Sequence, residues 1–83
     1  MIVMFYAYIL KSEKDHTFYY GSTKDLNLRL KNHNSGKERY TKGHIPYKLH
    51  YFETFQTRSE AMLREKFFKS IVGYNWLKNK NII

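Results

Sequence analysis

Two segments rich in aromatic and β-branched residues lie close together near the N-terminus of this chain. The first covers residues 3–11, the second covers residues 17–20, and only a short polar stretch separates them. Side chains of these types favour strands, and a short polar connection between two strands favours an antiparallel hairpin. Gly21 follows the second segment directly, and we expect this glycine to end the second strand. The chain therefore starts with a hairpin, against which the remaining elements have to pack.

A short helix is predicted immediately after the hairpin. Thr23 or Asp25 can cap its N-terminus, because either side chain can accept a hydrogen bond from the first turn. The helix is expected to run to about Asn34, where Ser35-Gly36 forms a strong stop. The same stop marks the start of a polar and basic segment.

The rest of the chain predicts a loop, a third strand and two helices, at residues 35–46, 48–55, 57–72 and 74–79 respectively. Thr57 and Glu60 have the spacing of a capping box, and Gly73 is expected to end the longer helix. The resulting order, β-β-α-β-α-α, predicts an α+β fold in which a three-stranded antiparallel sheet is flanked by helices. Residues 1–83 are expected to form one such domain, because no repeat, linker or low-complexity stretch interrupts them.

The charge balance points to a polyanionic partner. Fifteen Lys and Arg residues against seven Asp and Glu residues give a formal net charge of +8, and a basic surface binds phosphates with release of counterions. The chain has no cysteine, which excludes disulfides, zinc ribbons and thiol nucleophiles. No apolar run approaches the roughly 18 residues of a membrane span, and the N-terminus lacks the features of a signal peptide. We therefore expect a cytoplasmic protein with a polyanionic partner, of which nucleic acid is one candidate.

A few residues of these elements could take part in catalysis or metal binding. Arg29 and His33 lie four residues apart, so they share one side of the predicted helix and are expected at the edge of its buried face. Glu65 has a similar position on the later helix, and a single carboxylate with waters and substrate phosphate is enough to hold Mg²⁺. Tyr8 and Tyr19 lie on the paired strands, where a hydroxyl can reach the rim of the core. Each of these features alone is also accounted for by an ordinary surface or core residue.

Taken in order, these residues resemble the motifs of the GIY-YIG nuclease superfamily, above all its small stand-alone bacterial domains. The superfamily also includes intron-homing endonucleases and the incision subunit of bacterial nucleotide excision repair. Tyr6-Ala7-Tyr8 stands where the family has Gly-Ile-Tyr, and Tyr19-Tyr20-Gly21 stands where it has Tyr-Ile-Gly. Arg29 falls at the family's catalytic arginine, His33 at the following His or Tyr, and Glu65 at the metal-binding glutamate. The resemblance covers nearly the whole chain and implies the fold order derived above.

The chain also departs from the family pattern. Tyr6-Ala7 replaces the first Gly-Ile, and Ser22 stands where the repair enzymes have a lysine. The family's C-terminal asparagine corresponds to Asn79 or to Asn75, and its distance from Glu65 favours Asn79. No separate DNA-recognition domain accompanies these motifs, so we expect structure-directed or weakly specific action.

The resemblance implies hydrolysis of a DNA phosphodiester bond with one Mg²⁺ or Mn²⁺ ion, in processes such as DNA repair. Glu65 would hold the metal, Arg29 would stabilise charge that develops on the phosphate, and Tyr8 would position the phosphate or the water. Tyr19, or His33 through a water, would accept the proton of the attacking water. Asn79 would complete the set of site residues. Contacts to the DNA backbone would come from Lys31, Lys37, Arg39 and Lys42.

Two other functions stay open at this point. A noncatalytic nucleic-acid-binding module would keep the fold and the charge without turnover, and a basic adaptor for an acidic protein surface would bind little DNA. Salt-sensitive binding is expected of a nuclease and of a binding module alike, whereas metal-dependent cleavage separates the two. The structure of the substrate (branched or single-stranded, DNA or RNA) and the oligomeric state are also left open by the sequence.

Overall fold

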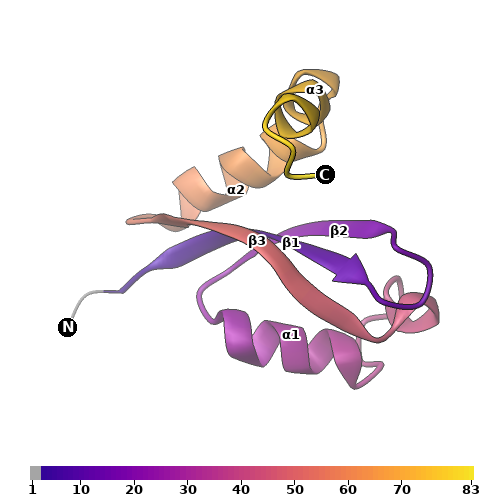
Figure 1. Cartoon of the computed structure of the whole chain (residues 1–83). Coiled ribbons are helices and arrows are strands. Elements are labelled where there is room, and N and C mark those ends of the chain that lie inside the picture. Colours follow the sequence, from indigo (N-terminus) through magenta and orange to yellow (C-terminus); the bar gives the residue numbers. More distant parts are fainter. Residues whose placement is uncertain (1–2) are drawn as a thin grey trace.

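A central antiparallel sheet organises the computed structural model, which describes residues 3–83. The strands are β1 (Phe5–Ser12), β2 (Phe18–Thr23) and β3 (Tyr47–Phe55). The helices are α1 (Leu26–Asn34), the short 3₁₀ helix η1 (Lys42–His44), α2 (Arg58–Phe68) and α3 (Ile71–Asn79). The strand order is β2-β1-β3, with α1 on one face of the sheet and α2 and α3 on the other (Figure 1). The expected α+β architecture, with its β-β-α-β-α-α order, is confirmed.

Alternate side chains of β1 build a separate apolar cluster on each face of the sheet. Ala7 and Ile9 are fully buried against Phe68 of α2 and Leu77 of α3. Tyr8 and Leu10 point the other way and pack with side chains of α1 and of the start of β3. The central strand is thus buried on both sides, whereas β2 and β3 each have one outer edge without a neighbouring strand among residues 3–83.

Gly21 does not end β2, contrary to expectation, but lies inside the strand. It pairs with Tyr8 in the antiparallel register of β1 and β2, and the strand continues to Thr23. A Cβ atom at Gly21 would overlap the hydroxyl and the ring of Tyr8. The glycine is therefore required because the Tyr8 side chain lies directly over this position, and not because the chain turns there.

Helix α1 begins and ends close to the predicted positions. Asp25 is the N-cap, and its carboxylate accepts a hydrogen bond from the backbone N–H of Leu28 at 3.0 Å. At the other end Gly36 has a φ of +80°, the left-handed conformation that terminates a helix. Asn34 then ties this end of α1 to β3, because its side-chain amide both accepts from and donates to the backbone of Tyr47.

The capping box of Thr57 and Glu60 is confirmed at the start of α2, but this helix ends earlier than predicted. It stops at Phe68, and Ser70 caps a new helix, α3, by accepting a hydrogen bond from the backbone N–H of Gly73. Gly73 therefore lies inside α3. A Cβ at this position would collide with the carbonyl group of Phe67, so this glycine permits the close approach of two helices at their junction.

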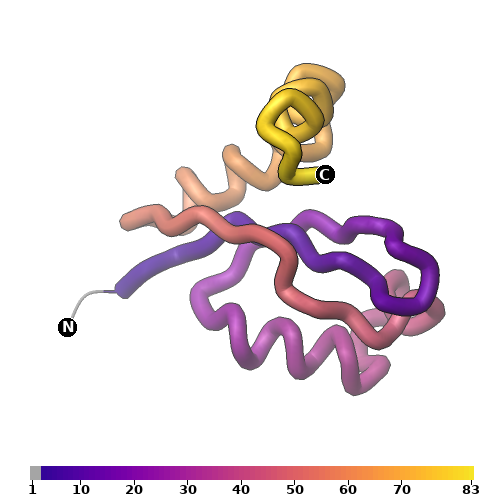
Figure 2. The backbone as a smooth tube through the Cα atoms, viewed as in Figure 1, coloured from indigo at the N-terminus to yellow at the C-terminus, as the bar shows by residue number. Residues whose placement is uncertain are grey.

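The loop between α1 and β3 lies beside the β1–β2 turn, far from it in sequence (Figure 2). The Ser12 hydroxyl donates to the backbone carbonyl of His44 at 2.5 Å, and the His44 ring pairs with the Asp15 carboxylate at 2.6 Å. Hydrogen bonds from Thr17 and then from His44 hold the pKa of Asp15 well below its usual range. These contacts fix the loop that carries Glu38, Tyr40 and Thr41. None of the helices within residues 3–83 is long and apolar enough to cross a membrane.

Candidate active site

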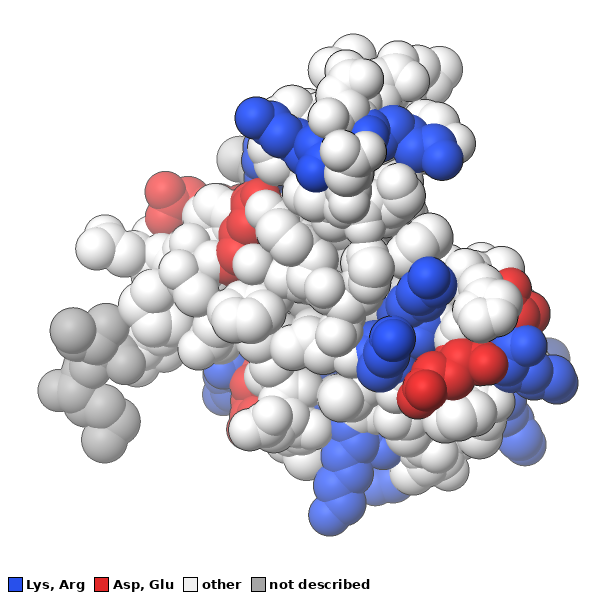
Figure 3. Space-filling model, viewed as in Figure 1, with Lys and Arg blue, Asp and Glu red and all other residues white. Residues whose placement is uncertain are grey.

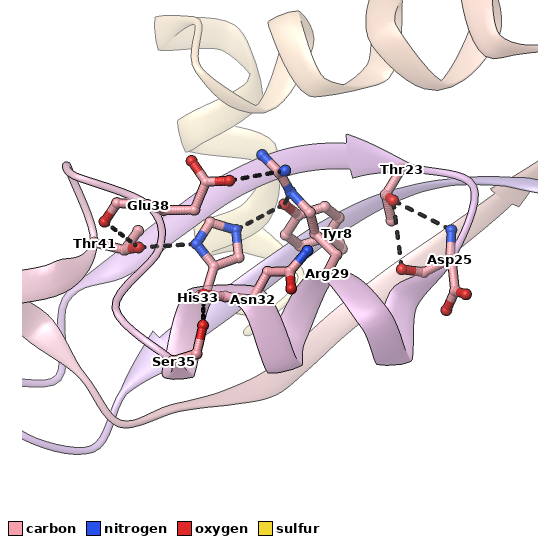
Figure 4. Close-up of polar contacts among 9 residues, drawn as sticks. All are labelled: Tyr8, Thr23, Asp25, Arg29, Asn32, His33, Ser35, Glu38 and Thr41. Atoms are coloured by element: carbon pink, nitrogen blue, oxygen red, sulfur yellow. Dashed lines mark hydrogen bonds and ion pairs between the residues drawn. The ribbon is translucent and has the colours of Figure 1, made fainter.

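Side chains from β1 and α1 meet in a hydrogen-bonded cluster on the α1 face of the sheet (Figure 4). The Nε–H of Arg29 donates to the Tyr8 hydroxyl at 3.2 Å. The same hydroxyl lies 3.2 Å from Nε2 of His33, and Nδ1 of His33 lies 2.9 Å from the hydroxyl of Thr41. Thr41 in turn donates to the backbone carbonyl of Glu38 at 3.4 Å. Three residues predicted from the sequence, Tyr8, Arg29 and His33, are thus brought into direct contact.

The order of donors and acceptors favours one tautomer of His33. Because Arg29 donates to the Tyr8 oxygen, the proton of that hydroxyl is available for Nε2 of His33. Because Thr41 donates to a backbone carbonyl, its oxygen accepts the proton on Nδ1. All hydrogen bonds then run in one direction, from Arg29 through Tyr8 and His33 to Thr41.

Burial keeps both Tyr8 and His33 in their neutral forms. Burial is the main reason that the pKa of Tyr8 is raised to about 12, and the nearby Arg29 offsets part of this increase. The pKa of His33 is lowered, first by burial and then by the positive charge of Arg29. The hydrogen bond from Tyr8 is the largest cause that raises the pKa of Arg29. A permanent cation is therefore held in place by two neutral, buried groups.

His33 lies deeper than the sequence indicated. It was expected at the edge of the buried face of α1, but its exposed fraction is 0% and both ring nitrogens are engaged within the protein. Thr41 and Tyr8 enclose it from the loop and from the central strand. Both ring nitrogens of His33 are therefore occupied by Tyr8 and Thr41 in this arrangement.

Arg29 also forms an ion pair with Glu38. One of its terminal nitrogens lies 3.0 Å from the Glu38 carboxylate, and both side chains are about one-third exposed, at 34% and 35%. A carboxylate and a phosphate present similar anionic oxygens to a guanidinium group. The Glu38 carboxylate therefore occupies a position beside Arg29 that suits an anionic oxygen.

Tyr19 of β2 joins the cluster through its ring. The ring centroid lies 4.8 Å from that of His33 and 5.9 Å from that of Tyr40 in the neighbouring loop. Tyr19 is half-buried, and no hydrogen bond ties its hydroxyl within residues 3–83. Tyr19 is thus the candidate whose hydroxyl is not committed to another group.

Glu65 lies on the opposite face of the sheet from Arg29 and His33. One carboxylate oxygen accepts a hydrogen bond from the hydroxyl of Ser22 at 2.8 Å, and the other pairs with Nζ of Lys69 at 2.6 Å. Ser22 pairs with Ala7, whose side chain packs toward α2. The negative charge of Glu65 nevertheless contributes to the raised pKa of Tyr8. The candidate site is therefore divided between two faces, and the edge strand β2 lies between its halves.

The surroundings of Glu65 fit a hard divalent cation with a single protein ligand. No group of three or more His, Cys, Asp or Glu side chains within residues 3–83 could hold a metal. The Glu65 side chain is 23% exposed, and its neighbour Lys69 is 52% exposed, so Lys69 can turn away from the carboxylate. A Mg²⁺ ion commonly keeps several waters and takes its other ligands from one or two carboxylates and a substrate phosphate.

The remaining predicted site residues lie outside these contacts. Asn79 is exposed at the C-terminal end of α3 and makes no hydrogen bond to Tyr8, Arg29 or Glu65 within the described part of the chain. The four basic side chains predicted to contact DNA are exposed, one on α1, two in the following loop and one at the start of η1: Lys31, Lys37, Arg39 and Lys42.

Sequence reasoning missed four residues that hold the others in place. Thr41 and Glu38 come from an irregular loop, in which no periodicity indicates which side chain turns inward. Ser22 was noted only as a departure from a family pattern. Lys69 carried a usable signal, because it follows Glu65 by four residues on a helix.

Known proteins resemble this chain over most of its length. A family model described as the GIY-YIG catalytic domain matches residues 4–79. The UPF0213 protein of Bacillus licheniformis is 46% identical over 71 residues, which cover 84% of this chain and 72% of that protein. The UPF0213 protein of Clostridium perfringens is 46% identical over 69 residues, which cover 82% of this chain and 73% of that protein.

A solved structure supports the same assignment. The solution NMR structure of the UPF0213 protein from Bacillus halodurans is similar with a TM-score of 0.53 at 35% sequence identity, over 92% of this chain and 83% of that one. The names of these relatives state a family and no activity. The motifs, the fold and the matched length agree, and the chain belongs to the GIY-YIG family.

Proposed function

We propose that this protein is a divalent-metal-dependent endonuclease that hydrolyses DNA phosphodiester bonds, with structure-directed or weak sequence specificity. Membership in a family of nuclease domains implies a nucleic-acid substrate. The observation that carries the proposal is the arginine held by neutral, buried partners: Arg29 is oriented by Tyr8, and Tyr8 is oriented by His33.

Arg29 has the chemical properties needed to stabilise charge on a phosphate. Its Nε–H is committed to Tyr8, which fixes the plane of the guanidinium group and leaves its terminal nitrogens for an anion. Glu38 holds one of these nitrogens in the absence of substrate. A phosphate that displaces Glu38 meets a preoriented cation, and removal of such an interaction typically lowers the rate by about 10²–10³.

Hydrolysis requires a water oxygen to bond to phosphorus while the bond from phosphorus to the 3′-oxygen breaks. We assign the acceptance of the water proton to the hydroxyl of Tyr19, because no hydrogen bond within residues 3–83 commits that hydroxyl to another group. Tyr8 and His33 then act as positioning residues for Arg29. The departing 3′-oxygen takes a proton from solvent.

Glu65 is the proposed metal ligand, and Ser22 holds its carboxylate in place from β2. Nucleases of this family generally depend on a divalent metal, which when bound orients the scissile phosphate and stabilises charge on the leaving oxygen. Lys69 balances the charge of Glu65 in the free protein and has to leave the carboxylate before a cation binds.

The exposed basic residues support contact with the DNA backbone. Figure 3 shows Lys and Arg side chains on both the α1 side and the α3 side of the face in view, interspersed with Asp and Glu side chains. We propose that Lys31, Lys37, Arg39 and Lys42 make sequence-independent phosphate contacts beside the site. A role for Asn79 in the site stays a proposal, which rests on the position of this residue in the sequence.

The test is cleavage of supercoiled plasmid and of branched DNA with Mg²⁺ or Mn²⁺, and with EDTA. We expect nicking that requires metal and is lost in Arg29→Gln and in Glu65→Gln, while Glu65→Gln still binds DNA. Arg58→Gln and Glu13→Gln are matched controls, because both side chains are exposed and lie outside the site. Cleavage that survives both site substitutions, or that persists in EDTA, would contradict the proposal.

One observation favours a second function, a noncatalytic nucleic-acid-binding module. Both groups that the chemistry needs are already paired within the protein, Arg29 with Glu38 and Glu65 with Lys69. Under this alternative the ion pairs are structural, and the protein binds the plasmid in a salt-dependent way without nicking it under any metal condition.

A further inference from the structure

A pocket beside the candidate site includes the proposed proton acceptor Tyr19, but the proposed chemistry gives its interior no occupant. It has a volume of about 430 Å³ and is lined by Phe18, Tyr19, Tyr20, Tyr40 and Lys69. This volume lies within the range of small-ligand pockets, which is about 300–1,000 Å³. Four of the five lining residues are aromatic, so the pocket offers flat apolar surfaces and one cation.

The pocket reaches both halves of the candidate site. Tyr19 points to the α1 face and contacts the ring of His33. Tyr20 points to the other face, where it packs with Phe68 of α2. Lys69 is the partner of the Glu65 carboxylate. The pocket therefore straddles the edge of β2, next to the two groups proposed to hold a scissile phosphate.

Tyr40 is the exposed wall of this pocket. Its exposed fraction is 74%, high for a large aromatic side chain, and its ring lies 5.9 Å from that of Tyr19 and 6.2 Å from that of His44. Arg39 and Lys42, both exposed, lie near it in the same loop. An exposed aromatic ring among basic side chains is the arrangement with which proteins bind unpaired bases, because the ring stacks on the base and the cations contact the backbone.

We propose that this pocket binds an unpaired nucleobase of the DNA strand, adjacent to the phosphate held between Arg29 and Glu65. The identity of the ligand rests on the proposed function, whereas the pocket and its chemistry do not. Bases inside a duplex are stacked on their neighbours and cannot enter such a pocket without leaving the helix. The substrate strand is therefore single-stranded, or has an unpaired nucleotide, at the point of contact.

The test measures binding without cleavage. The probes are a short fluorescent oligothymidine and an oligomer of equal length whose residues all lack bases, in buffer with EDTA. Both carry the same phosphates, so their difference in affinity isolates the contribution of the bases. We expect the wild-type protein to bind oligothymidine about ten times more tightly than the abasic oligomer, since stacking on aromatic side chains gives gains of this order.

Substitutions test whether the preference for oligothymidine depends on the ring of Tyr40. Tyr40→Leu should abolish the preference for oligothymidine, while Tyr40→Phe keeps the ring and should retain it. Phe52→Leu is a matched control, because Phe52 is also exposed, at 46%, and lies outside the pocket. The dependence of binding on salt should stay the same in Tyr40→Leu, because no charge is removed. As a second readout, the ring signals of Tyr40 should shift in NMR spectra with oligothymidine and not with the abasic oligomer.

Either of two results overturns the base pocket: equal affinity of the wild-type protein for the two oligomers, or an equal loss for both in Tyr40→Leu. Failure of the proposed function gives a different pattern. A base preference that depends on Tyr40, in a protein that never nicks the plasmid, supports the pocket and refutes the nuclease. Cleavage that depends on Arg29 and Glu65 without any base preference supports the nuclease and refutes the pocket.

Discussion

Replacement of Thr41 by valine tests the buried hydrogen-bond chain directly. Valine has nearly the same shape as threonine, but it removes the oxygen that accepts the proton on Nδ1 of His33. Thr41 and His33 both have an exposed fraction of 0%, so no water replaces the lost acceptor. A change of tautomer does not repair the loss, because a proton on Nε2 leaves the Tyr8 hydroxyl without its acceptor.

The expected cost follows from this burial. A buried donor without a partner costs about 1–3 kcal/mol, so we expect Thr41→Val to lower the free energy of unfolding by about 2 kcal/mol. For a domain of this size each kcal/mol corresponds to about 4–8 °C in melting temperature. Urea unfolding followed by circular dichroism measures the first quantity, and calorimetry measures the second.

A serine at the same position serves as the control. Thr41→Ser keeps the hydroxyl and should retain most of the stability. The proposed tautomer predicts that ¹⁵N NMR of the wild-type protein shows the proton of His33 on Nδ1. A valine variant within about 0.5 kcal/mol of the wild type, the size of a neutral surface substitution, would refute the reasoning, as would a proton on Nε2.

Three further predictions concern the same cluster. Gly21→Ala should destabilise the fold by about 1–3 kcal/mol, as overpacking does, because the new methyl group overlaps Tyr8; urea unfolding equal to wild type would contradict this. The unfolded chain protonates His33 near pH 6.5, whereas its lowered pKa keeps the folded protein unprotonated. Stability should therefore decline, by up to about 1.4 kcal/mol per pH unit, as the pH falls through that value; a His33→Gln variant with the same decline would show that the slope has another source. Glu38→Gln frees Arg29 from its ion pair, so DNA affinity at low salt should rise. The slope of log affinity against log salt concentration should steepen by about 0.9 for one added phosphate contact. An unchanged slope, measured by fluorescence anisotropy, would show that Arg29 gains no phosphate contact.

Local signals in the sequence predicted most of the fold. The hairpin, the stop after α1 and the capping box of α2 each depend on residues that are neighbours in the sequence, so the sequence alone could predict them. The two wrong predictions both concern glycines. Gly21 was read as a turn and Gly73 as a helix end, whereas each lies inside its element because another part of the chain comes too close for a side chain. Such contacts depend on packing between elements, which no local pattern reports.

The sequence likewise predicted one part of the candidate site and not the rest. The resemblance to the family motifs implied that Tyr8, Arg29 and His33 act together, and the structure brings them into contact. The depth of His33 was not predictable, because it depends on Thr41, which a loop without periodicity carries inward. The position of Glu65 across the sheet from Arg29 was also hidden, since motif order says nothing about which face of a sheet a helix covers.

The location of the site on β2 has a consequence for how the protein behaves in solution. An outer strand with free backbone groups is a template on which another chain can add a strand, and proteins commonly cover or shorten such strands. Here β2 has to stay accessible if DNA is to reach both halves of the site. The formal charge of +8 opposes such pairing between two copies, because like charges on the two copies repel each other. Neutralising that charge would favour aggregation along the outer edge of β2, the edge that the proposed cleavage of DNA requires to be open.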